Sequence, residues 1–328
     1  MIVSPVDPSD ADDVADLVAV TNAVRACDSP WEHLMTAREA VGELRHGWEG
    51  RPAARFLGRV DGVPVATGSY ETSAYDNRHL VWVGVLVRPD HRRRGHGSAL
   101  FTTLRDRARA EGRTSIGIGG WDATTTVAFA RAQGLDRRAV EVNRRQWLGE
   151  LDRAALAAAY DGARPHAAGY ELVRVLGRSD DADLPALAAM TAAINDAPTD
   201  DLDIEDSVFA PERIRAYEDA QVARGHLLHR VMARENATGA LAGHSVVAVD
   251  GERPSLAEQH DTSVVAAHRG HRLGLLLKLE MLRWLAETQP QVATIDTWNA
   301  ESNDRMIGVN ELLGYRVVGR ELAFQGRV

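Results

Sequence analysis

The sequence predicts a mixed α/β fold, an α+β arrangement with mixed sheets, built as two tandem domains. Two observations predict it. The length of 328 residues fits two domains of ordinary size. A strand, a polar glycine-containing turn and an amphipathic helix occur around Gly97, and the same layout returns in register around Gly274. Self-similarity over so long a period indicates duplication of one domain.

The elements of the first copy follow from periodicity and turn signals. Residues 2–6 are predicted to form a strand, and Ser9 or Asp10 to cap a helix in which Val14 and Leu17 recur at helical spacing. Asp61-Gly62 is a hairpin signal between two alternating stretches. The other predicted elements are a helix at 31–48, strands at 54–60, 63–70 and 79–87, a helix at 98–111, a strand at 115–118, a helix at 124–133 and a strand at 139–148.

The second copy repeats this order after an alanine-rich linker segment at 151–168, which is predicted to begin with a helix. We therefore expect domains at 1–150 and 169–328. Pro211 stands in the first turn of a predicted helix, where its missing N–H costs nothing. The predicted elements are a strand at 170–176, helices at 182–195 and 211–224, strands at 226–234, 240–249 and 257–265, a helix at 272–290, a strand at 292–298, a helix at 304–313 and a strand at 315–324.

Composition narrows the class of protein. The net charge of −9 argues against a nucleic-acid partner and suits a cationic substrate, or solubility alone. Cys27 is the only cysteine and the histidines lack ligand spacing, so we expect no disulfide framework and no metal. No apolar run reaches the length of a membrane span, and residues 1–5 lack a signal pattern. A cytoplasmic monomer or homodimer without membrane contact is expected.

The turn of the first copy predicts a phosphate site. Residues 92–97 read R-x-x-G-x-G between a β-branched run and a helix. Glycines let the backbone approach a phosphate, and the first helix amides lie unpartnered at the positive end of the dipole. Arg92, Arg93 and Arg94 add charge. In the second copy Arg272 replaces the first glycine and still offers its N–H to a phosphate if its φ is negative.

This stretch resembles the acetyl-CoA motif [QR]-x-x-G-x-[GA] of the GNAT superfamily of N-acetyltransferases, here in a tandem two-domain form. The resemblance implies a twisted sheet with helices on both faces, and acetyl-CoA as cofactor. Its pyrophosphate would bind the turn, and its pantetheine arm would lie between two splayed strands. The implied cofactor-binding residues are Val85, Leu86, Val87, Arg92, Arg93, Arg94, Gly95, His96, Gly97, Ser98, Val264, Val265, Ala266, Arg269, Gly270, His271, Arg272, Leu273, Gly274, Leu275 and Asn303.

Acetyl transfer to an amine needs a base and donors to the developing oxyanion. Glu258 stands eleven residues before Arg269, the place of the general base in histone-modifying members of the family, and Val81 stands there in the first copy. Strand alternation would put Glu258, His260 and Thr262 on one face. His260 is the alternative base. The amides of residues 264–266 are expected to bind the thioester.

The short helix of the second copy carries two further polar residues. Asn303 resembles the family asparagine that touches the pantetheine, and Asn310 replaces the tyrosine that often serves as acid. Ala123 and Ala130 stand at these places in the first copy. The second domain is therefore expected to be catalytic, and the first to be degenerate or supporting.

An acidic stretch at 195–206 lies where the family shapes its acceptor site. Asp196, Asp200 and Asp201 are candidate ligands for an amino sugar or an aminoglycoside-like amine, or belong to a solvated loop. The leading prediction is a small-molecule N-acetyltransferase that works by direct transfer. A protein or peptide N-acetyltransferase and a non-catalytic acyl-CoA-binding module are the alternatives.

Overall fold

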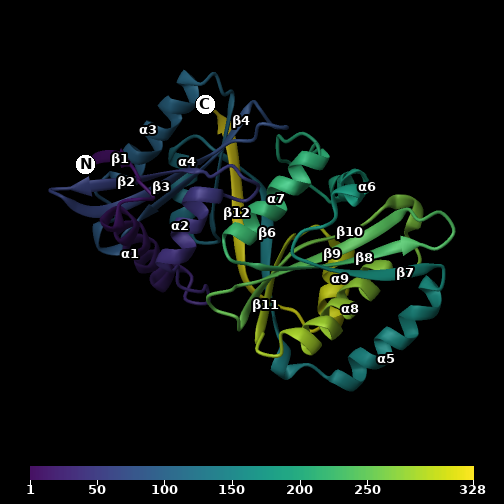
Figure 1. Cartoon of the computed structure of the whole chain (residues 1–328). Coiled ribbons are helices and arrows are strands. Elements are labelled where there is room, and N and C mark those ends of the chain that lie inside the picture. Colours follow the sequence, from purple (N-terminus) through teal and green to yellow (C-terminus); the bar gives the residue numbers. More distant parts are fainter. The chain divides into compact units, whose positions relative to one another are not determined.

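The computed structural model describes all 328 residues and divides the chain into two units (Figure 1). Unit 1 comprises residues 1–141, 199–207 and 319–328, and unit 2 comprises residues 142–198 and 208–318. This division differs from the expected domains, because the second half of the first repeat's last strand (Asp136–Trp147) belongs to unit 2 and most of the second repeat's last strand (Arg316–Arg327) belongs to unit 1. The short segment 199–207 also joins unit 1.

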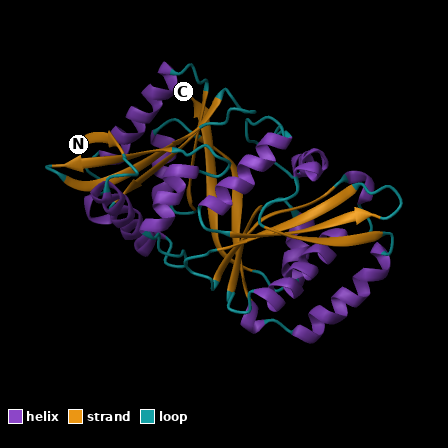
Figure 2. Ribbon diagram, viewed as in Figure 1, coloured by secondary structure: helices purple, strands orange, loops and turns teal.

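The strands of unit 1 follow the order β1-β2-β3-β4-β5-β12. Figure 2 shows the strands in orange and the helices in purple. Only β4 and β5 pair in parallel among the registers of these strands. The strand β12 enters unit 1 at Gly319 and pairs antiparallel with β5. The strands are β1 (Ile2–Pro5), β2 (Ala54–Val60), β3 (Val63–Glu71), β4 (Leu80–Val87), β5 (Ser115–Trp121) and β12 (Arg316–Arg327).

Helices cover both faces of this sheet. On one face α1 (Ala11–Asp28) packs against β3 and against α2 (Ala37–His46). On the other, α3 (His96–Ala110) packs against β3 and β4, beside α4 (Thr124–Ala132), and buries Leu100, Phe101 and Leu104. Asp10 caps α1, as predicted. The predicted helix at 31–48 begins only at Ala37, because Thr36 and Glu39 form a capping box there.

Unit 2 repeats the plan with the order β6-β11-β10-β9-β8-β7, in which β10 and β11 are parallel. Its larger core lies between the sheet and α8 and includes Leu276, Leu277 and Val247. A smaller core under α6 and α7 includes Leu187 and Met232. The strands are β6 (Asp136–Trp147, of which residues 142–147 belong to unit 2), β7 (Tyr170–Leu176), β8 (Leu227–Glu235), β9 (Leu241–Val249), β10 (Leu256–Val264) and β11 (Thr294–Ala300).

The predicted linker is an ordered part of unit 2. It forms helix α5 (Arg153–Ala163) and a short 3-10 turn, and α5 runs along α8 (Figure 1). The other helices of unit 2 are α6 (Leu184–Thr191), α7 (Pro211–Ala223), α8 (Leu273–Thr288) and α9 (Asp304–Leu312). No helix in either unit has both the length and the apolar character of a membrane span.

Candidate active site

Each unit places a short turn between a strand and the start of a long helix. In unit 1 the turn joins β4 to α3, and in unit 2 it joins β10 to α8. The first hydrogen bonds inside these helices are donated by Ala99 and Leu276. The amides of residues 96–98 and 273–275 therefore have no partner inside their helices. Each turn presents three N–H groups at the positive end of a helix dipole, which suits a phosphate.

The residues predicted to bind the cofactor lie at these two places. Residues 85–87 end β4, and residues 92–98 form the turn and the first residues of α3. In unit 2, residues 264–266 follow the end of β10, and residues 269–275 form the turn and the start of α8.

Two residues of each turn adopt the left-handed backbone conformation, and the units distribute glycine over them in opposite ways. In unit 1 they are Arg93 (φ 62°) and Gly95 (φ 85°), and in unit 2 they are Gly270 (φ 87°) and Arg272 (φ 56°). The condition of a negative φ at Arg272 is therefore not met, since Arg272 takes the conformation of Gly95. The two turns follow the same path, and each carries one strained arginine.

The first arginine of each turn is bound within its own unit. Arg92 and Arg269 each donate Nε to the carbonyl five residues earlier, at 3.0 and 3.1 Å. Arg92 also makes a bidentate pair with Asp28, at 2.9 and 2.6 Å, and Arg269 pairs with Asp196. These side chains fix the turns to the end of α1 and to the segment that follows α6. Asp196, predicted to bind the acceptor amine, is the partner of a turn arginine.

The other basic side chains of the turns differ between the units. Arg93 and Arg94 are exposed in unit 1, and Arg94 donates to a carbonyl inside the turn at 3.0 Å. In unit 2, His271 and Arg272 contact backbone carbonyls at positions 166 and 162, at 3.2 and 3.4 Å. The linker segment therefore restrains the turn of unit 2, and unit 1 has the more open cationic turn.

The strand that enters each turn separates from its parallel neighbour partway along. The pairing of β4 with β5 ends at Val83, and that of β10 with β11 ends at Glu258. Antiparallel pairing on the other side alternates, so every second N–H beyond these rows points into the gap. The N–H of Val265 donates to the carbonyl of Ala242 at 2.9 Å, so this amide of the predicted thioester site is not available.

A β-bulge distinguishes β10 from β4. The register of β10 on β9 shifts between Gln259 and Asp261, and one residue is added to the strand. Gln259 and Thr262 both contact Ser245, at 3.3 and 2.9 Å, whereas Asp261 contacts His244, the neighbour of Ser245 that faces the other way. The predicted alternation is therefore wrong, because Thr262 shares the face of Gln259 and Asp261 lies on the other face.

The added residue also changes which positions correspond between the units. The parallel pairing begins at Leu80 in unit 1 and at Leu256 in unit 2. Two residues further along, Trp82 pairs with Gly117 in unit 1, and Glu258 pairs with Asp296 in unit 2. Glu258 therefore corresponds to Trp82 and not to Val81, as counting back from the turn had indicated.

The two predicted bases of unit 2 have different surroundings. The carboxylate of Glu258 is 49% exposed and lies 3.8 Å from Nε2 of His260. His260 is buried, and its Nδ1 lies 2.6 Å from the hydroxyl of Tyr217. Burial lowers the pKa of His260 to about 3. His260 is therefore neutral at working pH and a weak base, and Glu258 has the better access to a substrate.

The two predicted asparagines serve the structure of α9. Asn303 caps the helix by accepting from the backbone N–H of Met306 at 3.3 Å. Asn310 is fully buried; its Oδ1 accepts from Lys278 at 2.8 Å and its Nδ2 donates to Asn299 at 2.7 Å. The amide of Asn310 therefore positions a buried lysine. Burial lowers the pKa of Lys278 to about 7.

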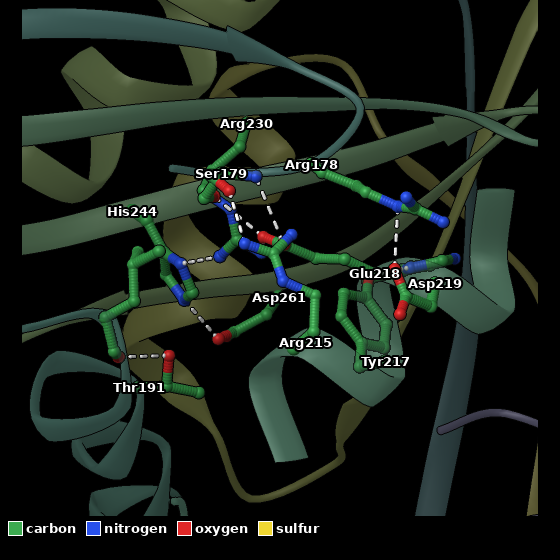
Figure 3. A network of polar contacts seen from close by, with 12 residues as sticks. Arg178, Ser179, Thr191, Arg215, Tyr217, Glu218, Asp219, Arg230, His244 and Asp261 are labelled. Atoms are coloured by element: carbon green, nitrogen blue, oxygen red, sulfur yellow. Dashed lines mark hydrogen bonds and ion pairs between the residues drawn. The ribbon is translucent and has the colours of Figure 1, made fainter. Parts of the chain in front are cut away.

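Sequence reasoning missed a buried polar network beneath the bulge (Figure 3). Arg230 donates to Glu218 at 3.1 Å and lies 2.8 Å from Nδ1 of His244, whose Nε2 lies 2.5 Å from Asp261. Glu218 is 0% exposed and Arg230 is 2% exposed. The network joins α7 to the bulged part of β10. Charged residues at inward positions of α7 and β8 were its only signal in the sequence.

Two of the three predicted acceptor carboxylates belong to unit 1. Asp200 and Asp201 lie in the segment 199–207. The backbone N–H of Asp201 donates to the carbonyl of Arg138 at 3.1 Å, and that of Asp203 donates to the Gln325 side chain at 2.7 Å. This segment is thereby fixed to β6 and β12. No group of three or more His, Cys, Asp or Glu residues is arranged to hold a metal ion.

Comparisons with known proteins agree with this geometry. The model of the acetyltransferase (GNAT) family matches residues 18–135, within the first repeat. A tandem GNAT protein from the clavulanic acid biosynthesis pathway, solved without AcCoA, has a TM-score of 0.82 at 27% identity, over 99% of this chain and 98% of that one. No curated protein sequence matches significantly.

Two further solved structures share the fold. A GCN5-related N-acetyltransferase from Sphaerobacter thermophilus has a TM-score of 0.68 at 14% identity, over 99% of this chain and 95% of that one. A putative acetyltransferase from Pyrococcus horikoshii has a TM-score of 0.61 at 13% identity, over 100% and 89%. With two phosphate-binding turns, two strand gaps and these matches, the first repeat is a GNAT acetyltransferase domain, and the chain is an acyltransferase with the fold of a tandem GNAT protein.

Proposed function

We propose that this acyltransferase moves an acetyl group from acetyl-CoA to a primary amine of a small molecule by direct transfer. The combination of an amide-lined turn with a strand gap, present in both units, carries the proposal. The free amides of residues 96–98 and 273–275 fit a pyrophosphate. The unpaired edges of β4 and β10 fit the amides of a pantetheine arm. Acetyl-CoA supplies the activated acetyl group.

The chain itself must manage one proton. An amine is protonated at neutral pH and attacks only after it loses a proton. In unit 2 the proposed base is Glu258, which lies in the last paired row before the gap with its carboxylate half-exposed. The carboxylate takes the proton, directly or through water, and the nitrogen lone pair is then free to attack. His260 stays neutral beside it.

A small amine is favoured over a protein by two observations. The similar tandem GNAT protein comes from a pathway that makes a small molecule, clavulanic acid. The net charge of −9 favours cationic ligands. The polypeptide alternative is tested beside the small amines.

The first test measures thiol release by the full chain with acetyl-CoA and a panel of amino sugars, aminoglycosides, polyamines and lysine peptides. We expect release with a small amine. Glu258→Gln should lower kcat at least tenfold while calorimetry gives an unchanged Kd for acetyl-CoA. Glu311→Gln, which removes an exposed carboxylate of α9, is the matched control.

Other results would revise the proposal in distinct ways. Release with peptides alone would point to a protein acetyltransferase. Binding of acetyl-CoA without thiol release for any amine would indicate an acyl-CoA-binding module. Full activity of Glu258→Gln would reject this residue as the base.

A further inference from the structure

A carboxylate of β12 lies over β5 in unit 1. Glu321 pairs with Trp121 across the two strands. Its neighbours Leu322 and Phe324 pack into the core under α3, so Glu321 faces the side of the sheet that α1 covers. A Cβ added at Gly119 would collide with Oε1 of Glu321. The carboxylate therefore occupies the space that a side chain at position 119 would fill.

This position adjoins the gap between β4 and β5. The two strands pair as far as Val83 and Ile118, so Gly119 is the first residue of β5 beyond the pairing. Gly119 is exposed although it lies within a sheet strand. The carboxylate of Glu321 thus lies beside the gap between β4 and β5.

Aromatic side chains flank this carboxylate. The ring of Trp82 lies over Gly117, 2.6 Å from the position of an added Cβ, and the ring of Trp121 lies over Gly319 in the same way at 2.5 Å. Trp31, from the connection between α1 and α2, meets Trp121 edge to face at a centroid distance of 5.1 Å. Indole faces beside a carboxylate attract an ammonium group.

One indole N–H in this cluster lacks a partner. Nε1 of Trp31 is buried and makes no hydrogen bond, whereas Nε1 of Trp121 donates to Glu32 at 2.9 Å. A buried donor without an acceptor is costly, and a ligand hydroxyl or carbonyl oxygen would satisfy it. The cluster therefore fits a small amine that also carries an oxygen acceptor.

Two other carboxylates act electrostatically on Glu321. Glu32, held by Arg25 at 3.4 Å and by Ser29, and Glu141 of β6 are the nearby carboxylates. Burial first, and then these two carboxylates, raise the pKa of Glu321 to about 7. A carboxylate of this kind accepts a proton at neutral pH better than an ordinary glutamate does.

Unit 1 lacks a base on its own entering strand, because Trp82 occupies the position that corresponds to Glu258. We propose that unit 1 holds a second amine site, in which Glu321 of β12 accepts the proton that a substrate ammonium loses. The proposal that an acetyl group is transferred to this amine rests on the proposed function of the chain. The C–N bond forms as the C–S bond of the thioester breaks, and the sulfur leaves as thiolate. One ammonium proton goes to Glu321, and a second neutralises the thiolate.

The first experiment needs no turnover. The full chain is labelled with 13C at the glutamate side-chain carboxyl, and Glu321→Gln identifies the resonance of Glu321. We expect a titration midpoint near pH 7, and a lower midpoint in the presence of methylammonium chloride. A midpoint in the ordinary glutamate range, or one that methylammonium leaves unchanged, would overturn the site.

The second experiment measures kcat/KM against pH with acetyl-CoA and glucosamine, in a Glu258→Gln background that suppresses unit 2. Adding Glu321→Gln should lower the remaining rate at least tenfold and remove the inflection near pH 7. Asp136→Asn, which removes an 80% exposed carboxylate of unit 1, is the matched control. Gly119→Ala retains Glu321 but displaces its carboxylate, and should reproduce the loss. Circular dichroism and the Kd for acetyl-CoA check folding.

The outcomes separate the two proposals. If Glu258→Gln alone abolishes turnover, unit 1 is inactive and this inference fails while the proposed function stands. An unchanged residual rate in the Glu321→Gln variant also overturns it. If no amine is acetylated, the proposed function fails, and the carboxyl titration with methylammonium still decides whether unit 1 binds an ammonium.

Discussion

The buried network of unit 2 gives a sharp stability prediction, because two adjacent acidic residues of α7 differ in burial. Glu218 is 0% exposed and accepts hydrogen bonds from the Ser179 backbone N–H (3.1 Å) and hydroxyl (2.7 Å), from Arg215 (3.0 Å) and from Arg230 (3.1 Å). Asp219 pairs with Arg178 at 2.6 Å, and the two side chains are 45% and 57% exposed.

Glu218→Gln removes the negative charge and leaves the buried guanidinium of Arg230 without its carboxylate (Figure 3). Breaking a buried pair in this way costs about 3–5 kcal/mol of unfolding free energy. Asp219→Asn removes an exposed pair, which contributes at most about 1 kcal/mol. The variants differ by one position on the same helix, so burial is the variable that separates them.

The assay is native-state hydrogen exchange of peptides from β8 and β9, because two units need not unfold together and a single midpoint would mix them. Glu218→Gln should lower the opening free energy of these peptides by about 3 kcal/mol or more. Peptides from unit 1 are the control, because their opening free energy should change only if the substitution destabilises the whole chain. A loss below about 1 kcal/mol, or equal losses in the two variants, would refute the reasoning that the charge of Glu218 compensates Arg230.

Three further predictions concern the turns and the bulge. Arg272→Gly and Arg93→Gly should each stabilise their unit by about 1 kcal/mol in urea unfolding, since glycine relieves the positive φ; destabilisation would show that the arginine side chains hold the turns. In calorimetry, Gly97→Trp and Gly274→Trp should each remove one acetyl-CoA site, and loss of both sites by one change would contradict two independent sites. His260 has a folded pKa of about 3 against 6.5 unfolded, so unit 2 should lose up to about 1.4 kcal/mol per pH unit as pH falls below about 6.5. His260→Asn should flatten this acid limb, and an equally steep limb would assign the loss to other groups.

The duplicated fold and the family could be predicted from the sequence because their signals are local. The turn around Gly97 combines glycines, arginines and a following helix within a few residues. Its second copy around Gly274 fixes the tandem plan. The comparisons confirm a GNAT acetyltransferase domain in the first repeat, the mixed α/β fold and the tandem organisation.

The side-chain assignments were less predictable, because they depend on pairing between distant residues. The bulge near Gln259 adds one residue without any turn signal, and it moved the counterpart of Glu258 by one position. Arg92 and Arg269 look like phosphate ligands in the sequence, but acidic partners far along the chain hold them. The roles of Glu258 and Asn303 in catalysis and cofactor binding stay predictions.

The exchange of strands had no local signal. β6 and β12 stand at equivalent places in the two repeats, so each has a sequence that suits the end of either sheet. The pairing of β12 with β5 is decided by tertiary contacts, among them Leu322 and Phe324 in the core under α3.

This exchange has a consequence for the order of events during synthesis. Residues 1–141 leave the ribosome first, but the sheet of unit 1 is completed only by residues 319–328, after all of unit 2 has been made. Until then β5 is an open edge, available to other chains. A nascent chain arrested before Gly319 would therefore hold a finished unit 2 beside an unfinished unit 1. Chaperone demand should then concentrate on the half that was translated earliest.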